Sequence, residues 1–166
     1  MVSAKPRKKI YSDPYELKLL LDEIRERAKI LVFANGCFDL LHVGHVRYLR
    51  AAKSCGDILV VAVNSDESMR SIKPDREPLQ PDVERYEILS ELESIDFVVP
   101  LRERTPVELI TLYRPDVHTK GTDYRDKFIP ERATVESYGG RVELVGDEKN
   151  HSTSDLIRTV QKPLLS

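Results

Sequence analysis

The sequence lacks the marks of a secreted or membrane-spanning protein. Only two of its 166 residues are cysteines, which is too few for a disulfide framework. No N-terminal stretch has the apolar core of a signal peptide, and no apolar run approaches the roughly 20 residues needed to cross a bilayer. We therefore expect a cytoplasmic protein that makes no membrane contact.

An excess of charge of one sign is also missing. The 26 lysines and arginines nearly balance the 28 aspartates and glutamates, which leaves a formal charge of -2. A general nucleic-acid binder would have a net basic domain, so nucleic acid is not an expected partner. The basic tail in residues 1–12 is a short terminal charge run of the kind that is usually solvated, and we assign it no function.

Neither internal repeats nor low-complexity segments divide the chain. Its length suits one domain that buries a substantial core without disulfides or a structural metal. Residues 1–166 are therefore predicted to form a single domain, with the basic tail at 1–12 and a leading helix at 13–28. That helix is indicated by Asp13-Pro14-Tyr15-Glu16, in which a capping residue, a proline and a first-turn glutamate come together.

Strand and helix patterns alternate along the rest of the chain. The continuous apolar run at 58–63 is typical of a strand buried on both faces of a parallel sheet. Further strands are predicted at 30–34, 96–100, 116–120 and 141–145, and helices at 46–55, 83–92, 105–113, 131–138 and after 152–155. This alternation predicts an α/β fold: a Rossmann-like, open parallel sheet of five strands with helices on both faces.

Two local patterns make more detailed predictions. Thr105-Pro106-Val107-Glu108 has the spacing of a capping box and is predicted to open the helix at 105–113. Residues 70–81 contain three prolines, so they are predicted to form a loop rather than a long helix. That loop carries Lys73 and Arg76, and functional residues often lie on such loops.

The turn after the first strand carries the strongest chemical signal. Residues 35–46 join His42 and His45 to Gly44 between an apolar strand and a helix. The two histidines fall on one face of the helix start, where free N–H groups and the helix dipole favour an anion. Gly44 lets a phosphate approach the backbone closely, and imidazoles can donate hydrogen bonds to oxygens that gain charge during a reaction. The turn therefore predicts a nucleotide-phosphate site.

Two other interpretations of this turn stay open. The histidines could be structural, or zinc could be bound by Cys37, His42 and His45, with Cys55 as a fourth ligand. However, the spacing matches no standard zinc finger or ribbon, and no CxxC pair occurs. Two histidines around a glycine, between a strand and a helix, form a joint signal that structural histidines rarely give. We therefore favour phosphate binding, with Cys37 as a small turn residue.

Several further candidates follow the other predicted strands. Ligands of open parallel sheets bind beyond the carboxyl ends of the strands, so these residues should meet at one edge. They are Asn35, Gly36, Cys37, Phe38 and Asp39 after the first strand, Asn64, Asp66 and Lys73 after the second, Lys120, Gly121 and Asp123 after the fourth, and Ser152, Thr153 and Ser154 before the last helix.

The usual phosphate-binding glycine motifs do not occur. No GxGxxG follows the first strand and no GxxxxGK[ST] is found, so dinucleotide-binding and P-loop interpretations lose their main support. Instead, His42-Val43-Gly44-His45 resembles the motif of the HxGH nucleotidyltransferases, which act on phosphopantetheine, nicotinamide mononucleotide, glycerol phosphate or heptose phosphate. The resemblance implies transfer of a nucleoside monophosphate to a phosphate-bearing acceptor, with release of pyrophosphate and help from Mg²⁺.

Over residues 30 to 160 the chain most resembles the adenylyltransferases that act on D-glycero-β-D-manno-heptose 1-phosphate. The likeness is carried by segments 63–66, 120–124 and 152–154, although Thr122 replaces the usual second glycine and Ser154 the usual second threonine. Cytidylyltransferase relatives carry an arginine before the last helix, whereas this chain has Gly-Asp-Glu-Lys-Asn-His at 146–151. That difference favours adenine over cytosine.

The resemblance also implies roles for the candidate residues. His42 and His45 would act on the triphosphate, Lys73 would bridge the acceptor phosphate and the α-phosphate, and Arg85 would contact phosphate oxygens. Asn64 and Asp66 would bind the acceptor, and Asp123 the ribose. The remaining nucleotide contacts would come from Asn35, Gly36, Cys37, Phe38, Asp39, Gly44, Lys120, Gly121, Ser152, Thr153 and Ser154.

The expected reaction transfers AMP from ATP to heptose 1-phosphate and gives ADP-heptose and pyrophosphate. A sugar 1-phosphate, with a second pKa of about 6, is already an anionic nucleophile near neutral pH, so no general base is required. The expected partners are ATP, the sugar phosphate and a second copy of the chain in a homodimer. Two alternatives stay open: a cytidylyl- or adenylyltransferase for glycerol 3-phosphate or a flavin, and a non-catalytic nucleotide sensor.

Overall fold

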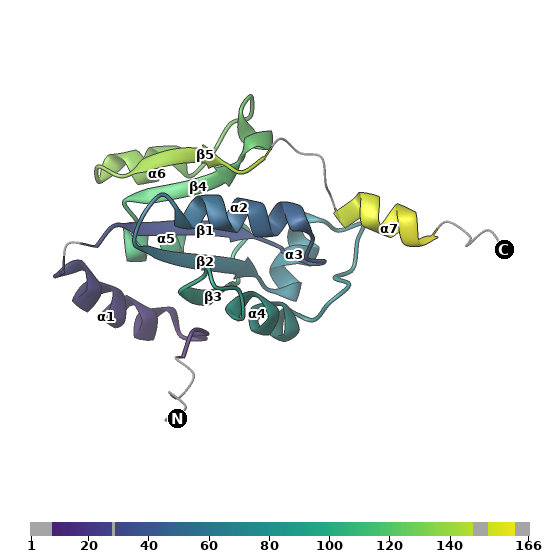
Figure 1. Ribbon diagram of the computed structural model, residues 1–166, viewed down its shortest axis with the longest axis horizontal. Coiled ribbons are helices and arrows are strands. Elements are labelled where there is room, and N and C mark those ends of the chain that lie inside the picture. Colours follow the sequence, from purple (N-terminus) through teal and green to yellow (C-terminus); the bar gives the residue numbers. More distant parts are fainter. Residues whose placement is uncertain (1–7, 28, 148–152, 162–166) are drawn as a thin grey trace.

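A single parallel sheet organises the computed structural model, which describes residues 8–27, 29–147 and 153–161. The strands lie in the order β3-β2-β1-β4-β5, which runs from bottom to top in Figure 1. Their bounds are β1 Leu31–Gly36, β2 Ile58–Asn64, β3 Phe97–Leu101, β4 Val117–Gly121 and β5 Arg141–Val145. The chain moves outward from β1 in one direction to β2 and β3 and in the other to β4 and β5. The crevice between the ends of β1 and β4 is therefore the topological switch point of the sheet.

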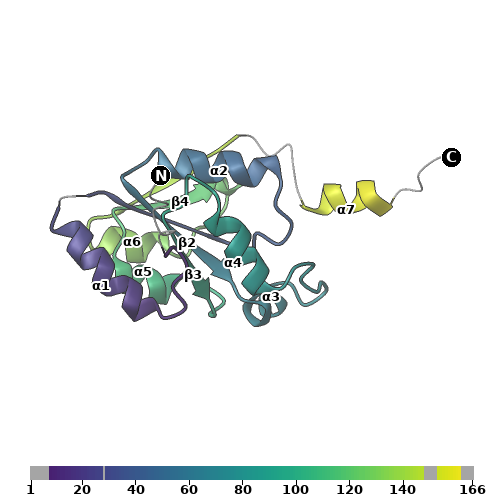
Figure 2. The same cartoon turned by 60° about the horizontal axis from the view of Figure 1, so that its bottom comes forward.

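Helices cover both faces of this sheet, as the sequence predicted (Figures 1 and 2). One face packs against α1 Pro14–Arg25, α5 Val107–Tyr113 and α6 Arg132–Ser137, and the other against α2 Val43–Lys53 and α4 Asp82–Ser90. Two short elements, α3 Asp66–Ile72 and the 3₁₀ helix η1 Thr122–Tyr124, follow β2 and β4. The last helix, α7 Thr153–Gln161, stands away from the sheet in both views.

The central strand shows why its sequence is apolar at consecutive positions. Phe33 of β1 packs in the core beneath α1 and α5, whereas Val32 and Ala34 pack in the core beneath α2 and α4. All three side chains are fully buried. Because successive side chains of a strand point to opposite faces, a strand covered on both sides needs apolar residues throughout.

The predicted start of the first helix is confirmed, whereas the predicted start of α5 is not. Asp13 caps α1 as predicted, because its side chain accepts a hydrogen bond from the Tyr15 N–H at 2.8 Å. The capping box predicted at Thr105 is wrong. The structure makes Pro106 the capping residue of α5, with its carbonyl accepting from the Ile110 N–H at 2.9 Å and no side-chain cap. The helix thus starts one residue later than the box requires, and Glu108 no longer occupies the third position.

The loop predicted at 70–81 begins later than expected. Helix α3 continues to Ile72, so only residues 73–81 lie outside a helix before α4. Its start is fixed by Ser65, whose side chain accepts from the Ser68 N–H at 3.2 Å, and by acidic residues in the first turn. None of the helices in the described part of the chain has the length and apolar character needed to cross a bilayer.

Candidate functional site

A cavity of about 520 Å³ lies at the carboxyl edge of the sheet. Segments that follow all five strands contribute to its wall, which explains how residues far apart in sequence meet there. Most of the predicted site residues line it: Asn35, Gly36, Cys37, Phe38, Asp39, His42, Gly44, His45, Asn64, Lys73, Lys120, Gly121 and Asp123. The convergence expected from parallel strands is therefore observed.

The two histidines lie together at the start of α2. Their rings stack with centroids 3.8 Å apart and an interplanar angle of 23°. The backbone N–H of His42 donates to Nδ1 of His45 across 3.4 Å, so in the neutral ring the proton resides on Nε2. Burial, and next the neighbouring charges of His42 and Lys73, lower the pKa of His45 to about 4. His45 is therefore neutral near pH 7 and offers an Nε2–H donor at the cavity.

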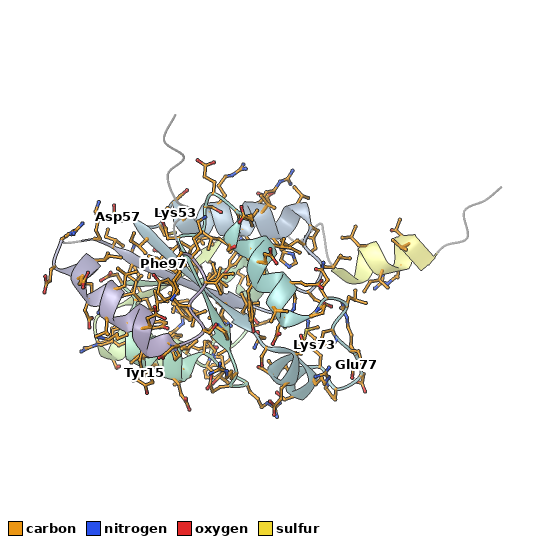
Figure 3. All side chains as sticks on the ribbon, turned by 90° about the horizontal axis from the view of Figure 1, so that it is seen from below. Tyr15, Lys53, Asp57, Lys73, Glu77 and Phe97 are labelled. Carbon is orange, nitrogen blue, oxygen red and sulfur yellow. The ribbon has the colours of Figure 1, made fainter. Side chains whose placement is uncertain are left out.

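Lys73 follows the last residue of α3 and lines the cavity. Figure 3 shows Lys73 and Glu77 on one loop, at the other end of the sheet from Lys53 and Asp57. The Lys73 side chain is exposed, so its ammonium group is available to an anion in the cavity.

Asp39 anchors that loop beside the histidine turn. Its Oδ2 pairs with Arg76 Nη2 at 2.8 Å, and its Oδ1 accepts from the backbone N–H groups of Leu79 at 2.8 Å and Gln80 at 3.2 Å. The Asp39 residue is only 4% exposed. Although it lines the cavity, its carboxylate is used to hold the loop that carries Lys73. The nucleotide contact expected of Asp39 stays a prediction.

Arg85 lies behind the cavity wall rather than on it. Its residue is 1% exposed, and its guanidinium donates to the carbonyls of Cys37, Asn64 and Gln80 and to the carboxylate of Asp66. These bonds tie together the ends of β1 and β2 and the start of α4. In the described structure Arg85 is therefore a positioning residue, and the phosphate contact expected of it stays a prediction.

Asp66 is held by Arg85 in the same way, and the acceptor contact expected of it stays a prediction. Asp66 Oδ1 accepts from Arg85 Nη2 at 2.7 Å, and Asp66 is not among the described residues that line the cavity. Asn64, which the sequence paired with Asp66, does line the cavity, and its side chain donates to Ser68 Oγ at 3.0 Å.

A buried polar cluster occupies the switch point. Lys120, at the end of β4, is 6% exposed, and its Nζ lies 3.0 Å from Asn35 Oδ1 and 3.4 Å from Glu131 Oε1. Burial lowers the pKa of Lys120, and the nearby Glu131 carboxylate opposes that shift. Next to Lys120, a Cβ on Gly121 would lie 2.7 Å from Asp123 Oδ1, so only glycine leaves Asp123 in its place. The ammonium of Lys120, the carboxylate of Glu131 and the amide of Asn35 thus lie together at the crevice.

The wall beside α2 contains residues that the sequence did not indicate. Gly146, with φ +92°, lets the chain after β5 turn against Tyr48, whose Cα would be 3.3 Å from an added Cβ. Asp147 then pairs with Arg47 at 2.8 Å, and its carbonyl accepts from Thr122 Oγ1 at 2.7 Å. The only sequence signal for this turn was Gly146 itself, a glycine directly after a predicted strand. Other lining residues that were missed are Ile72, Arg104, Pro106, Tyr124, Glu131 and Val145.

Predictions for the last helix fall at the limit of the described chain. Ser152 lies outside the described residues, and so do the side chains of Thr153 and Ser154, although the backbone of α7 begins at Thr153. Their contacts with a nucleotide stay predictions. Within the described part of the chain, no group of three or more His, Cys, Asp or Glu side chains is placed to hold a metal ion.

Comparison with known proteins assigns the chain to a family. The model of one family, described as cytidylyltransferase-like, matches residues 33–164. The chain belongs to the cytidylyltransferase-like family. It is 47% identical over 144 residues to the bifunctional protein HldE of Pelobacter propionicus, a match that covers 87% of this chain and 30% of that protein. The HldE of Geobacter metallireducens is 49% identical over 138 residues, covering 83% of this chain and 28% of the relative. The chain thus spans less than a third of the length of these relatives.

Solved structures agree with the fold. The lipopolysaccharide core biosynthesis protein from Thermoplasma volcanium superposes with a TM-score of 0.59 at 32% identity, covering 70% of this chain and 94% of the other. Pantoate-beta-alanine ligase from Francisella tularensis superposes with a TM-score of 0.62 at 11% identity, covering 92% and 77%. The second likeness concerns the fold alone.

Proposed function

We propose that this member of the cytidylyltransferase-like family transfers AMP from ATP to D-glycero-β-D-manno-heptose 1-phosphate and releases pyrophosphate. The observation that carries the proposal is the meeting of His42, His45 and Lys73 in one cavity at the carboxyl edge of the sheet. The match to HldE covers 87% of this chain and therefore overlaps the family match at 33–164, which supports a heptose 1-phosphate adenylyltransferase. The likeness to a lipopolysaccharide core biosynthesis protein points to the same class of acceptor.

The proposed reaction needs positioning and charge stabilisation more than covalent help. An oxygen of the acceptor phosphate attacks the α-phosphorus of ATP, and the bond between the α-phosphorus and the bridging oxygen breaks to release pyrophosphate. The neutral His45 donates from Nε2 to oxygens that gain charge, with His42 beside it at the helix N-terminus. Lys73 supplies a positive charge between the two reacting phosphates.

We also propose that Mg²⁺ enters with ATP. Mg²⁺ commonly keeps several waters and binds through one or two carboxylates together with substrate phosphates. The carboxylates on the described cavity wall are dispersed, and that of Asp39 is already used by Arg76 and two backbone N–H groups. These residues fit a metal carried by the triphosphate, where it would neutralise charge on the departing pyrophosphate. Asp123 is the lining carboxylate best placed, beside Gly121, to face the nucleotide.

Product analysis tests the proposed function. Purified protein is incubated with ATP or CTP and with heptose 1-phosphate or glycerol 3-phosphate, and products are separated by chromatography while pyrophosphate is measured. We expect an ADP-sugar from ATP and heptose 1-phosphate as the fastest product. Faster turnover of CTP with glycerol 3-phosphate would overturn the heptose assignment but keep the transferase. Nucleotide binding without turnover of any pair would instead favour a sensor.

We propose further that the protein acts in the cytoplasm as a homodimer. ATP is the expected co-substrate, and the chain's 26 basic and 28 acidic residues suit a solvated surface in an aqueous compartment. Light scattering of the purified chain measures the mass directly. A mass of twice 19.0 kDa supports the dimer, and a mass of 19.0 kDa contradicts it.

A further inference from the structure

Glu131 lines the cavity and carries a buried hydrogen-bond acceptor that has no partner among the described residues. The residue precedes α6 and its side chain is 6% exposed. Its Oε1 accepts from Lys120 Nζ at 3.4 Å, whereas its Oε2 is buried and has no hydrogen-bond partner among the described residues. Since buried polar atoms of native proteins nearly always find partners, a lone carboxylate oxygen in a cavity wall calls for an explanation.

The neighbours of Glu131 hold this acceptor in place. Lys120 Nζ is held by Asn35 Oδ1 at 3.0 Å and lies over the Tyr124 ring, 5.2 Å from its centroid. With Lys120 fixed from these sides, the carboxylate that it binds keeps Oε1 toward the lysine, and Oε2 is left without a partner among the described residues. Asn35 and Lys120 end β1 and β4, so the whole cluster is at the switch point where ligands of such sheets bind.

The chemistry of the atom restricts what it can bind. An ionised carboxylate only accepts hydrogen bonds, so its partner must carry an O–H or N–H group. Ionised phosphate groups of either substrate would be repelled, and their place is beside His42, His45 and Lys73. A purine ring is bound mainly by apolar and aromatic walls. The wall around Glu131 gathers a carboxylate, an ammonium and an amide beside the Tyr124 ring, which suits hydroxyl groups. Both the acceptor sugar and the ribose of ATP carry hydroxyls, and separate kinetic constants for the two substrates distinguish these two sources.

We propose that Oε2 of Glu131 accepts a hydrogen bond from a hydroxyl group of the acceptor sugar, so that Glu131 selects polyhydroxylated sugar phosphates. This inference rests on the proposed function and adds a specificity-determining residue to it. The carboxylate comes from the residue before α6, whereas the phosphate-binding groups come from the starts of α2 and of loop 73–81, so they would hold different parts of the acceptor. A sugar held at two places keeps its phosphate aligned with the α-phosphorus.

The test combines an isosteric variant with modified acceptors. Glu131→Gln keeps the size of the side chain, and its amide oxygen can still face Lys120 while an NH₂ donor replaces Oε2. Glu136→Gln is the matched control on the helix that follows Glu131, because Glu136 pairs with Arg132 at the surface. Steady-state constants are measured for ATP, for heptose 1-phosphate and for a series of sugar 1-phosphates that each lack one hydroxyl.

We expect Glu131→Gln to lower kcat/KM for the sugar roughly ten- to hundredfold, as for loss of a hydrogen bond to a charged group, with KM for ATP and the control variant nearly unchanged. One deoxy sugar should be a similarly poor substrate of the unaltered protein, yet the Gln variant should no longer discriminate against it. A merely structural role of Glu131 would not remove the preference for one particular hydroxyl.

Other outcomes overturn the inference. Unchanged hydroxyl preference in Glu131→Gln, or a rise in KM for ATP alone, contradicts it while the transferase survives. Failure of the unaltered protein to use any sugar phosphate removes the proposed function and the inference together. If Glu131→Gln does not fold, Glu131→Asp keeps the charge beside Lys120 but withdraws Oε2, and the same loss for the sugar is expected. An unaltered protein that uses every deoxy sugar equally well contradicts the inference without any variant.

Discussion

At the scale of single residues, His42 and His45 should matter for catalysis and not for folding. His45 is neutral near pH 7, and both imidazoles line the cavity instead of the core. Losing a donor that acts on developing charge typically costs on the order of 10²-fold or more in turnover. We therefore expect His42→Ala and His45→Ala each to lower kcat by about that factor, with circular dichroism and thermal unfolding close to those of the unaltered protein. Near-normal kcat in both variants would contradict the proposed role.

Lys73 should affect turnover more than nucleotide binding. Its ammonium group is proposed to act between the reacting phosphates, so it contributes mainly once both substrates are bound. We expect Lys73→Ala to depress kcat at saturation much more than it raises the Kd for ATP, and Lys73→Arg to restore activity only in part, because a planar guanidinium replaces a compact ammonium.

Kinetics and ATP titration check this prediction side by side. Arg70→Ala is the matched control, since Arg70 lies on the helix that ends directly before Lys73 and pairs with exposed Glu77. The prediction is contradicted if Lys73→Ala leaves kcat unchanged and raises the Kd for ATP by the same factor by which it lowers kcat/KM.

At the scale of elements, the contacts of Asp39 make loop 73–81 and the histidine turn one unit. Three donors from the loop share this carboxylate. We expect Asp39→Asn to release the loop, raise its amide hydrogen exchange and lower kcat, because Lys73 loses its fixed position. The Asp39→Asn and Lys73→Ala effects on kcat should be far from additive, as for residues that act through one another. Additive effects with unchanged exchange would show that the loop is held by other contacts.

The elements also show what the sequence could predict. Burial on both faces makes strands such as β2 nearly continuous apolar runs, so the parallel sheet, its five strands and the carboxyl-edge site could be predicted. The start of α5 could not, because Thr105 and Pro106 compete for the capping position and tertiary packing decides between them. The role of Arg85 was equally hidden. The family resemblance implied a phosphate contact, and only the fold reveals that backbone carbonyls surround its guanidinium.

Glu131 was missed for a related reason. It is one of 28 acidic residues, and nothing in its neighbourhood along the chain distinguishes it from a surface glutamate. Its importance arises from the return of α6 to the end of β4, which places its carboxylate 3.4 Å from Lys120. Contacts of this kind depend on the three-dimensional path of the chain and leave no periodic signal in the sequence.

At the scale of the whole molecule, the buried His118 and the half-buried His45 make stability depend on pH. Burial lowers the pKa of His118 to about 3 and, together with nearby positive charge, that of His45 to about 4, against 6.5 for the exposed ring. The unfolded chain therefore takes up protons first as pH falls. The stabilisation is complete above pH 6.5 and is lost toward pH 4 and pH 3.

Urea unfolding from about pH 7 to about pH 5 should show this loss, with each histidine contributing a slope of up to about 1.4 kcal/mol per pH unit. His118 donates from Nδ1 to the Phe33 carbonyl in the core and is not among the described residues that line the cavity. A His118→Gln variant should therefore have a shallower slope, whatever its absolute stability. An equal slope in both proteins would assign the pH dependence to other groups.

The bonds of Arg85 have a consequence for any large-scale mutational survey of this protein. The Arg85 guanidinium makes four hydrogen bonds, to the segments that follow β1 and β2 and to the one that precedes α4. A lysine, with its single compact ammonium, cannot reproduce their geometry. A survey scored by growth or turnover alone would rank Arg85 with His42 and His45. Scored by the abundance of folded protein, the three positions should separate: the histidine variants accumulate normally, while Arg85→Lys is depleted. Sensitivity to substitution and contact with the substrate are thus different properties at this edge of the sheet.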